Sequence, residues 1–293
     1  MWVATNFLAL RIPLIKKGAY FNLARSGLLQ SLKKQIGRNS RYAVTVFTTT
    51  DCNLGCGYCF QNTAPAKAGE FRPQRIRSSR IDNETLNDAV EFVRRAMESQ
   101  GLRGLDLLLM GGEPLLYRGD AERTLEAFGK LGPLRADIVT NGTQLTVERA
   151  RTLETLGLRE AQLTFDGDRE SHDSVRHTVA GLATFDLISK NLRDCLDGTD
   201  IRFTLRVNVS ASNLEGIPLL IQQLAEICGK EAYRCSIDIA LIDGTFTQER
   251  EPIPPHARRG SRWKCLRICG RVRISVVPPR GGWGVCVLLA GGR

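Results

Sequence analysis

Short apolar runs alternate with amphipathic stretches through most of the chain, and this alternation predicts its fold. The six predicted strands cover residues 42–50, 105–110, 136–140, 160–166, 201–209 and 234–242. The predicted helices between them lie near residues 83–100, 121–131, 147 onward, 185–196 and 214–228. Strands that alternate with helices favour a parallel sheet, because a parallel neighbour needs a long crossover connection. Six such units predict an α/β fold with a partial (β/α)6 TIM-like barrel.

Pattern and composition divide the chain into three parts. Residues 1–40 form an irregular, basic N-terminal lead-in, and residues 41–250 carry the alternation of strands and helices. Residues 251–293 form a Gly-, Pro- and Arg-rich tail that does not conform to it, apart from the short strand-like run VRISVV at 272–277. The abrupt change predicts a frameshifted or truncated reading frame. A disordered basic tail is the alternative, although Trp, Cys and Val are frequent for one.

A net charge of +10 could indicate a nucleic-acid partner, but most of this charge lies at one end of the chain. Residues 251–293 hold eight Arg and one Lys against one Glu, so the tail supplies +8 and the main body is nearly neutral. We therefore expect no nucleic-acid partner. No stretch approaches the ~20 apolar residues of a membrane span, and the N-terminus lacks the pattern of a secretion signal. Nine cysteines in such a chain predict a reducing, cytoplasmic location, where thiols bind metal or stay free.

Unusual loops follow the first four predicted strands. Three cysteines follow the first strand, and residues 111–114, 141–143 and 166–167 follow the next three. Functional residues of β/α barrels gather at the C-terminal ends of the strands, which lie at one rim. The sequence therefore predicts a single site at that rim.

Cys52, Cys56 and Cys59 lie within eight positions, with three and then two residues between them. A zinc site, disulfides and an iron–sulfur cluster are the candidate explanations. A reducing compartment disfavours disulfides. A zinc site requires four ligands, usually two pairs of Cys or His with the second pair downstream. A cubane cluster on three thiolates leaves one iron without a protein ligand, which a small molecule can chelate. Elsewhere in the barrel region, the single cysteines are expected to be buried free thiols: Cys195, Cys228 and Cys235.

The arrangement Cys52-x-x-x-Cys56-x-Tyr58-Cys59 resembles the cluster motif of the radical S-adenosylmethionine (radical SAM) superfamily. GGEP at 111–114 resembles the family's methionine-amino motif. Three further segments resemble the subfamily of anaerobic sulfatase maturases and peptide-modifying enzymes that carry a C-terminal auxiliary-cluster (SPASM) domain. They are TNGT at 140–143, LTFDG at 163–167 and HDSVR at 172–176. The resemblance covers about residues 42–245.

The resemblance implies two cofactors, a [4Fe-4S] cluster on Cys52, Cys56 and Cys59, and S-adenosylmethionine (AdoMet) on the open iron. Reductive cleavage of AdoMet then gives a 5′-deoxyadenosyl radical that abstracts hydrogen from a substrate. The residues that it implies for contacts with AdoMet are Tyr58, Gly111, Gly112, Glu113, Pro114, Asn141, Thr164, Asp166 and Arg176. No catalytic residue is assigned, and neither His172 nor His177 is given a task.

The residue types suit several of these roles. Gly111 and Gly112 lack a Cβ and permit a close approach to the backbone, and Glu113 with the neighbouring carbonyls can accept from the cofactor's ammonium group. Arg176 follows Thr164 by twelve residues, and its guanidinium suits the planar carboxylate of the cofactor. Thr164 stands where close relatives carry Ser.

Two of these residues have alternative explanations. Asp166 contacts the ribose or caps a loop. Asn141 reaches the cofactor or tolerates a left-handed turn before Gly142.

The tail departs from the family, because Cys265, Cys269 and Cys286 do not reproduce the spacing of the auxiliary-cluster domain. The leading hypothesis is an enzyme that modifies a peptide or protein substrate, with a reducing donor such as a flavodoxin or ferredoxin as partner. Oxidation of Ser or Cys, as in the sulfatase maturases, is the alternative within enzymes, and a small-molecule substrate also stays open. A truncated cluster-binding remnant without turnover, or a module that binds a leader peptide, represents a different class.

Overall fold

The computed structural model describes residues 41–59, 76–210, 212–241, 273–276 and 287–288. The strands are β1 (Arg41–Phe47), β2 (Gly104–Met110), β3 (Leu134–Thr140), β4 (Leu158–Phe165), β5 (Arg202–Val209), β6 (Cys235–Leu241), β7 (Arg273–Val276) and β8 (Val287–Leu288). The α-helices are α3 (Asn83–Gln100), α4 (Asp120–Gly129), α5 (Val147–Thr155), α6 (Arg169–Val175), α7 (Phe185–Gly198) and α8 (Ile217–Cys228). Two short 3₁₀ segments flank α8, η1 (Leu214–Gly216) and η2 (Gly229–Arg234).

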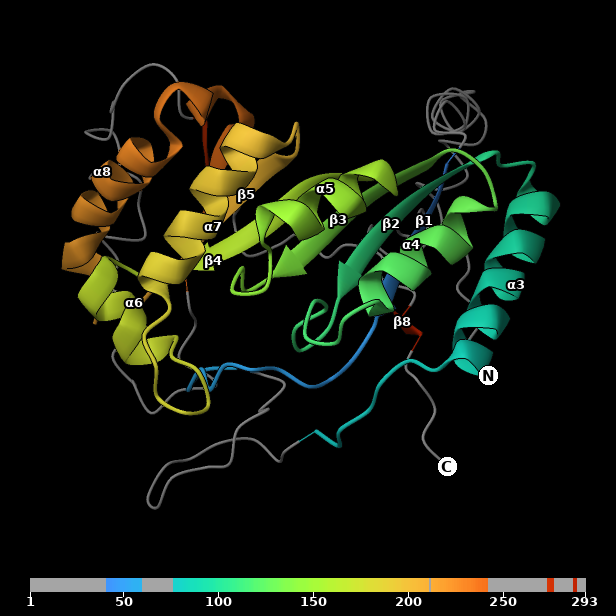
Figure 1. Cartoon of the computed structure of the whole chain (residues 1–293), viewed down its shortest axis with the longest axis horizontal. Helices are drawn as coiled ribbons and strands as arrows, with labels where there is room; N and C mark the ends of the chain where they lie inside the picture. The colour runs from blue at the N-terminus through green and yellow to red at the C-terminus, as the bar shows by residue number, and fades with distance from the viewer. Residues whose placement is uncertain (1–40, 60–75, 211, 242–272, 277–286, 289–293) are drawn as a thin grey trace, which may run out of the picture.

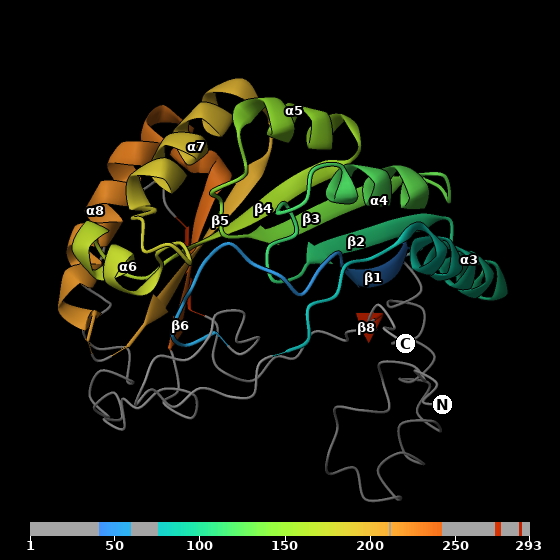
Figure 2. The same ribbon diagram turned by 60° about the horizontal axis from the view of Figure 1, so that its bottom comes forward.

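All the strands belong to one parallel sheet, in the order β7-β6-β5-β4-β3-β2-β1-β8. Figure 1 shows the helices packed along this sheet, and Figure 2 shows α4, α5, α7 and α8 on its convex face. Within the described residues β7 and β8 do not pair with each other, so the sheet stays open. The predicted α/β fold, a partial barrel around six parallel strands, is confirmed.

Three local details differ from the sequence-based prediction. No helix is predicted between the fourth strand and residue 185, but this stretch contains the short helix α6. The helix predicted from residue 214 begins at Ile217, after the 3₁₀ segment η1. Strand β7 lies within the run 272–277, whereas β8 lies where no strand was expected. The lead-in 1–40 and the rest of the tail lie outside the described residues.

Strand β5 buries alternate residues, because in the described part of the chain helices cover one face of the sheet. On β5, Phe203, Leu205 and Val207 are buried in the core formed with the helices. Thr204 and Arg206 point to the opposite face and are half-buried. On β5, the concave face is therefore the polar one.

The structure also bears on the single cysteines and on membrane-spanning segments. Cys195, Cys228 and Cys235 are buried and free, as predicted. In the part of the chain that the structure describes, no helix combines the length and the apolar character that crossing a membrane requires.

Carboxylates crowd together on the concave face near the start of the strands. Asp137 on β3 is paired in register with Glu160 on β4, and Asp106 lies on the neighbouring strand β2. Asp137 is exposed at the surface of β3, yet desolvation by the surrounding protein, then the charges of Glu160 and Asp106, raise its pKa to about 6, against a lowering effect of Arg202. Because the folded-state pKa lies above the ordinary 3.8, stability is lost as the pH rises through about 6.

We therefore predict that Asp137→Asn raises the melting temperature at about pH 8 and that this gain disappears towards about pH 4. Thermal unfolding followed by circular dichroism across this range measures the effect. The matched control is Asp200→Asn, at an exposed position between α7 and β5. An equal gain at both pH values would contradict the explanation by charge.

Candidate functional site

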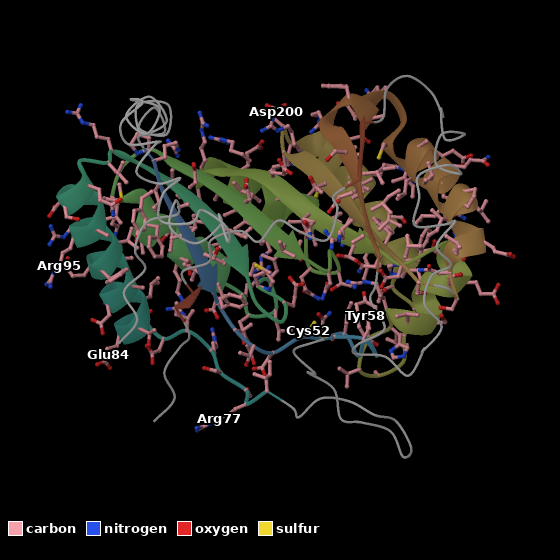
Figure 3. The ribbon with its side chains drawn as sticks, turned by 180° about the vertical axis from the view of Figure 1, so that it is seen from behind. Cys52, Tyr58, Arg77, Glu84, Arg95 and Asp200 are labelled. Atoms are coloured by element: carbon pink, nitrogen blue, oxygen red, sulfur yellow. The ribbon has the colours of Figure 1, made fainter. Side chains whose placement is uncertain are left out.

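The loops predicted to share a rim do meet at the carboxyl ends of β1 to β4. The backbone N–H groups of Gly112 and Glu113 donate to the carbonyls of Thr49 and Asp51, at 2.8 Å each. These bonds join the loop after β2 to the loop after β1. Figure 3 shows Cys52 and Tyr58, both on the loop after β1, at the same end of the sheet.

Cys52, Cys56 and Cys59 are all half-buried, and none of them forms a disulfide. The backbone around them is fixed from two sides. Cys59 N–H donates to the carbonyl of Cys56 at 3.2 Å, and residues 53–55 pair with residues 177–179 through two backbone bonds of 3.0 Å. The three thiols therefore lie on an ordered loop.

The surroundings of Cys52 and Cys56 favour the neutral form of these two thiols when no metal is bound. Burial, together with the charge of Glu113, raises the pKa of Cys52 to about 12, although hydrogen bonds from Leu54 and Asn141 act in the opposite direction. Burial also raises the pKa of Cys56, and the positive charge of Arg176 opposes it. A metal that binds these sulfurs must displace their protons.

Within its described residues, the cysteine loop does not form a site for a single metal ion. Among the described residues, no three His, Cys, Asp or Glu side chains converge on the position of a single ion. A cubane does not require such convergence, because each of its thiolates binds a different iron atom.

The two glycines of GGEP are required by the packing of one loop on another. A Cβ on Gly111 would lie 2.4 Å from the carbonyl oxygen of Thr49, and a Cβ on Gly112 would lie 2.2 Å from that of Asp51. The close approach expected for these glycines is thus made by the backbone of the cysteine loop. The carbonyl of Pro114 accepts a hydrogen bond from the hydroxyl of Thr48 at 3.4 Å.

Glu113 is completely buried, and its carboxylate is used within the protein. Oε1 accepts from the Thr140 hydroxyl at 2.7 Å and from Leu115 N–H at 2.9 Å, and Oε2 accepts from Asn141 N–H at 2.7 Å. Burial raises the pKa of Glu113, and these three donors oppose that shift. The side chain therefore joins the loop after β2 to the end of β3.

Asn141 is buried and points to the cysteine loop. Its Nδ2 lies 2.9 Å from Oδ1 of Asn53 and 3.6 Å from Sγ of Cys52, and its Oδ1 accepts from the backbone and the hydroxyl of Thr143. The left-handed conformation belongs to the next residue, Gly142, with φ of +81°.

A second polar cluster combines Tyr58, Asp166, Arg176 and Asn208. The Tyr58 hydroxyl donates to Asp166, and it accepts from Arg176 Nη1 at 2.7 Å and from Asn208 Nδ2 at 3.3 Å. Arg176 and Asp166 lie 3.7 Å apart and are both buried. Oδ1 of Asp166 and Nε of Arg176 are buried without a hydrogen-bond partner among the described residues. These two atoms can serve the polar groups of a ligand.

The remaining residues singled out in the sequence lie around this cluster. Thr164 is buried near the end of β4. His172 is fully buried on α6, and its ring bonds to Asp166 N–H at 3.4 Å and to the Thr184 hydroxyl at 3.2 Å. Burial, with a contribution from Arg176, lowers the pKa of His172 to about 3, so the ring is neutral and supports the loop. The ring of His177 bonds locally, with Nδ1 at 3.2 Å from the carbonyl of Thr178.

Sequence reasoning missed Asn53, Asn208 and Asn213. Asn213 donates to the carbonyls of Asp166 and Asn208 at 3.0 and 2.9 Å, so it ties the end of β4 to the end of β5. The rule that located the other loops also applies to the end of the fifth predicted strand, and it points to Asn208 there.

Comparison with known proteins identifies the family. The sequence model of the Radical SAM superfamily matches residues 46–201. The chain belongs to the radical SAM superfamily. This confirms the resemblance seen in the motifs, and members of the family use a [4Fe-4S] cluster and AdoMet.

Individual relatives differ in what they act on. The chain is 30% identical to the AdoMet-dependent heme synthase of Methanosarcina barkeri, over 70% of this chain and 52% of that protein. It is 26% identical to the PqqA peptide cyclase of Ruegeria pomeroyi, over 80% of this chain and 61% of that protein. The chain thus spans about half the length of the curated relatives it matches.

A solved structure shares the fold. Streptococcus suis SuiB, bound to its precursor peptide SuiA, superposes with a TM-score of 0.56 at 16% sequence identity. The match covers 84% of this chain and 53% of SuiB.

We predict that Gly112→Ala destabilises the protein by roughly 1–3 kcal/mol, because the added methyl group must displace the backbone of the cysteine loop. The control is Gly129→Ala at the end of α4, where the nearest atom to an added Cβ is 3.9 Å away. That change should be neutral or slightly stabilising. Chemical denaturation of both variants tests the prediction, and equal stabilities would contradict it.

Proposed function

We propose that this chain is a radical SAM enzyme that binds a [4Fe-4S] cluster through Cys52, Cys56 and Cys59 and acts on a peptide or protein substrate. One observation carries the proposal. The three thiols lie on one ordered loop, and Tyr58 on that loop contacts the buried pair Asp166 and Arg176, which retains unpartnered polar atoms. A cluster site and a site for a polar organic ligand are thus adjacent.

When bound, the cluster and AdoMet supply a one-electron cleavage that gives a 5′-deoxyadenosyl radical able to abstract hydrogen. The protein's contribution is to bind, to orient and to keep water away. Arg176 offers Nε and its positive charge to the carboxylate of AdoMet, and Asp166 offers Oδ1 to the ribose hydroxyls. Tyr58 holds both side chains in place through its hydroxyl.

The GGEP loop contributes through its backbone. Because both carboxylate oxygens of Glu113 are engaged inside the protein, we assign the contact with the ammonium group to the carbonyls of residues 111–113. The Thr164 hydroxyl, near the end of β4, completes the set of contacts with AdoMet, while Pro114 and Asn141 shape the loops around it. Residues 41–250 then form the catalytic domain.

The peptide or protein substrate is favoured by relatives named for peptide chemistry, the PqqA peptide cyclase and SuiB with its precursor peptide SuiA. A reducing donor such as a flavodoxin or ferredoxin in the cytoplasm supplies the electron in this proposal. A second candidate substrate is a tetrapyrrole, because the relative with 30% identity is a heme synthase. Mass spectrometry of peptides and of iron-porphyrin precursors after incubation with the reduced enzyme distinguishes the two classes.

We predict that Cys56→Ala abolishes both the cluster and the cleavage of AdoMet. The measurement is anaerobic reconstitution with iron and sulfide, followed by absorbance in the thiolate-to-iron charge-transfer region and by detection of 5′-deoxyadenosine. Cys195→Ala, at a buried thiol on α7, is the control and should keep both properties. A cluster that persists in Cys56→Ala refutes the ligand assignment, and wild-type protein that holds zinc and no iron refutes the proposed function.

We also predict that Arg176→Lys weakens AdoMet binding about tenfold while the cluster is retained, because an ammonium group cannot make the paired contacts of a guanidinium. Equilibrium dialysis of the reconstituted protein against labelled AdoMet measures this. The control is Arg169→Lys, whose exposed side chain pairs with Asp186. Unchanged affinity in Arg176→Lys would remove Arg176 from the cofactor site.

A further inference from the structure

One cysteine of the trio receives a side-chain hydrogen bond from a different loop. Nδ2 of Asn141, which follows β3, lies 3.6 Å from Sγ of Cys52, which follows β1. The same sulfur accepts from the backbone N–H of Leu54 at 3.4 Å. Both distances suit sulfur, whose radius exceeds that of oxygen.

The orientation of the Asn141 amide is fixed by its other partners. Its Oδ1 accepts from the backbone N–H of Thr143 at 3.0 Å and from the Thr143 hydroxyl at 2.7 Å. Its Nδ2 also donates to Oδ1 of Asn53 at 2.9 Å. A flipped amide would place an oxygen against Oδ1 of Asn53 and an NH₂ group against the N–H of Thr143. The NH₂ group must therefore face the sulfur.

The backbone that carries this amide is also held. Oε2 of the buried Glu113 accepts from Asn141 N–H at 2.7 Å. Asn191 on α7 donates to the carbonyls of Gly142 and Thr143, at 2.9 and 3.3 Å. The donor to Cys52 is thus positioned by groups from several elements and cannot easily turn away.

We infer that Asn141 raises the reduction potential of the cluster by donating an N–H···S hydrogen bond to the thiolate of Cys52. This inference rests on the proposed function, since it needs a cluster on the three cysteines. Reduction adds one electron and therefore negative charge, part of which is carried by the thiolate sulfurs. A fixed donor stabilises the reduced form more than the oxidised form, and the effect is larger in a buried site than in water.

The test is a potentiometric titration of the full-length, anaerobically reconstituted protein, followed by electron paramagnetic resonance of the reduced cluster in the absence of AdoMet. Asn141→Leu should lower the ratio of reduced to oxidised cluster at a given applied potential by up to tenfold. For a one-electron couple this corresponds to a midpoint potential that is lower by about 59 mV. Asn141→Asp keeps the oxygen that accepts from Thr143 but cannot donate when ionised, so it should shift the midpoint further in the same direction.

Asn191→Ala is the matched control, because it removes two bonds to the carbonyls of the next two residues, while Glu113, Asn53 and Thr143 still hold Asn141 and its amide. Its midpoint should equal that of the wild type. An unchanged midpoint in both Asn141 variants with intact cluster absorbance, or an equal shift in Asn191→Ala, overturns the inference. If Asn141→Leu takes up no cluster, Asn141→Asp decides alone. Wild-type protein that takes up no cluster refutes the proposed function instead, so the two failures are distinguishable.

Discussion

The arrangement of the candidate site depends on one buried carboxylate. Glu113 is removed from solvent, which is costly for a charged group, and three hydrogen bonds offset that cost. Two of its donors, the Thr140 hydroxyl and Asn141 N–H, belong to the end of the next strand. The loop after β2 is therefore locked to the end of β3, and loss of this carboxylate would leave buried donors unpaired on both.

The same loop is locked to the cysteines from its other side. Gly111 and Gly112 pack directly on the backbone of residues 49–51, in a space that admits no side chain. Asn141, held by Glu113, reaches the sulfur of Cys52. The GGEP and TNGT segments thus support the cysteine loop by direct packing and hydrogen bonds, and the position of the cysteines follows from the packing of three adjacent strand ends.

Much of this could be predicted from the sequence, because parallel topology converts order along the chain into position in space. Six short apolar runs separated by helical patterns define the sheet, and unusual residues after successive runs must then lie along one edge. The grouping of Cys52, Glu113, Asn141 and Asp166 follows from that rule alone. The helix α6 could not be predicted in this way, because six of its seven residues are polar and form no apolar period. The helix is stabilised instead by its N-cap Asp168 and the buried His172.

What could not be predicted is which polar group binds which. Glu113 and Asn141 have residue types that suit an ammonium group or a ribose, and no local pattern distinguishes a residue that faces a ligand from one that faces the next loop. Whether a hydrogen bond forms depends on differences of a few tenths of an ångström in the distance between segments more than twenty residues apart in the sequence. Only the assembled sheet defines those distances. Arg176 and Asp166 differ from Glu113, because their polar atoms are not all engaged within the protein. Although they pair with each other and with Tyr58, each keeps one buried atom without a partner. Because a buried polar atom is rarely left unsatisfied without a reason, these two atoms, and not the more conspicuous Glu113, are the ones that we propose for contact with a ligand.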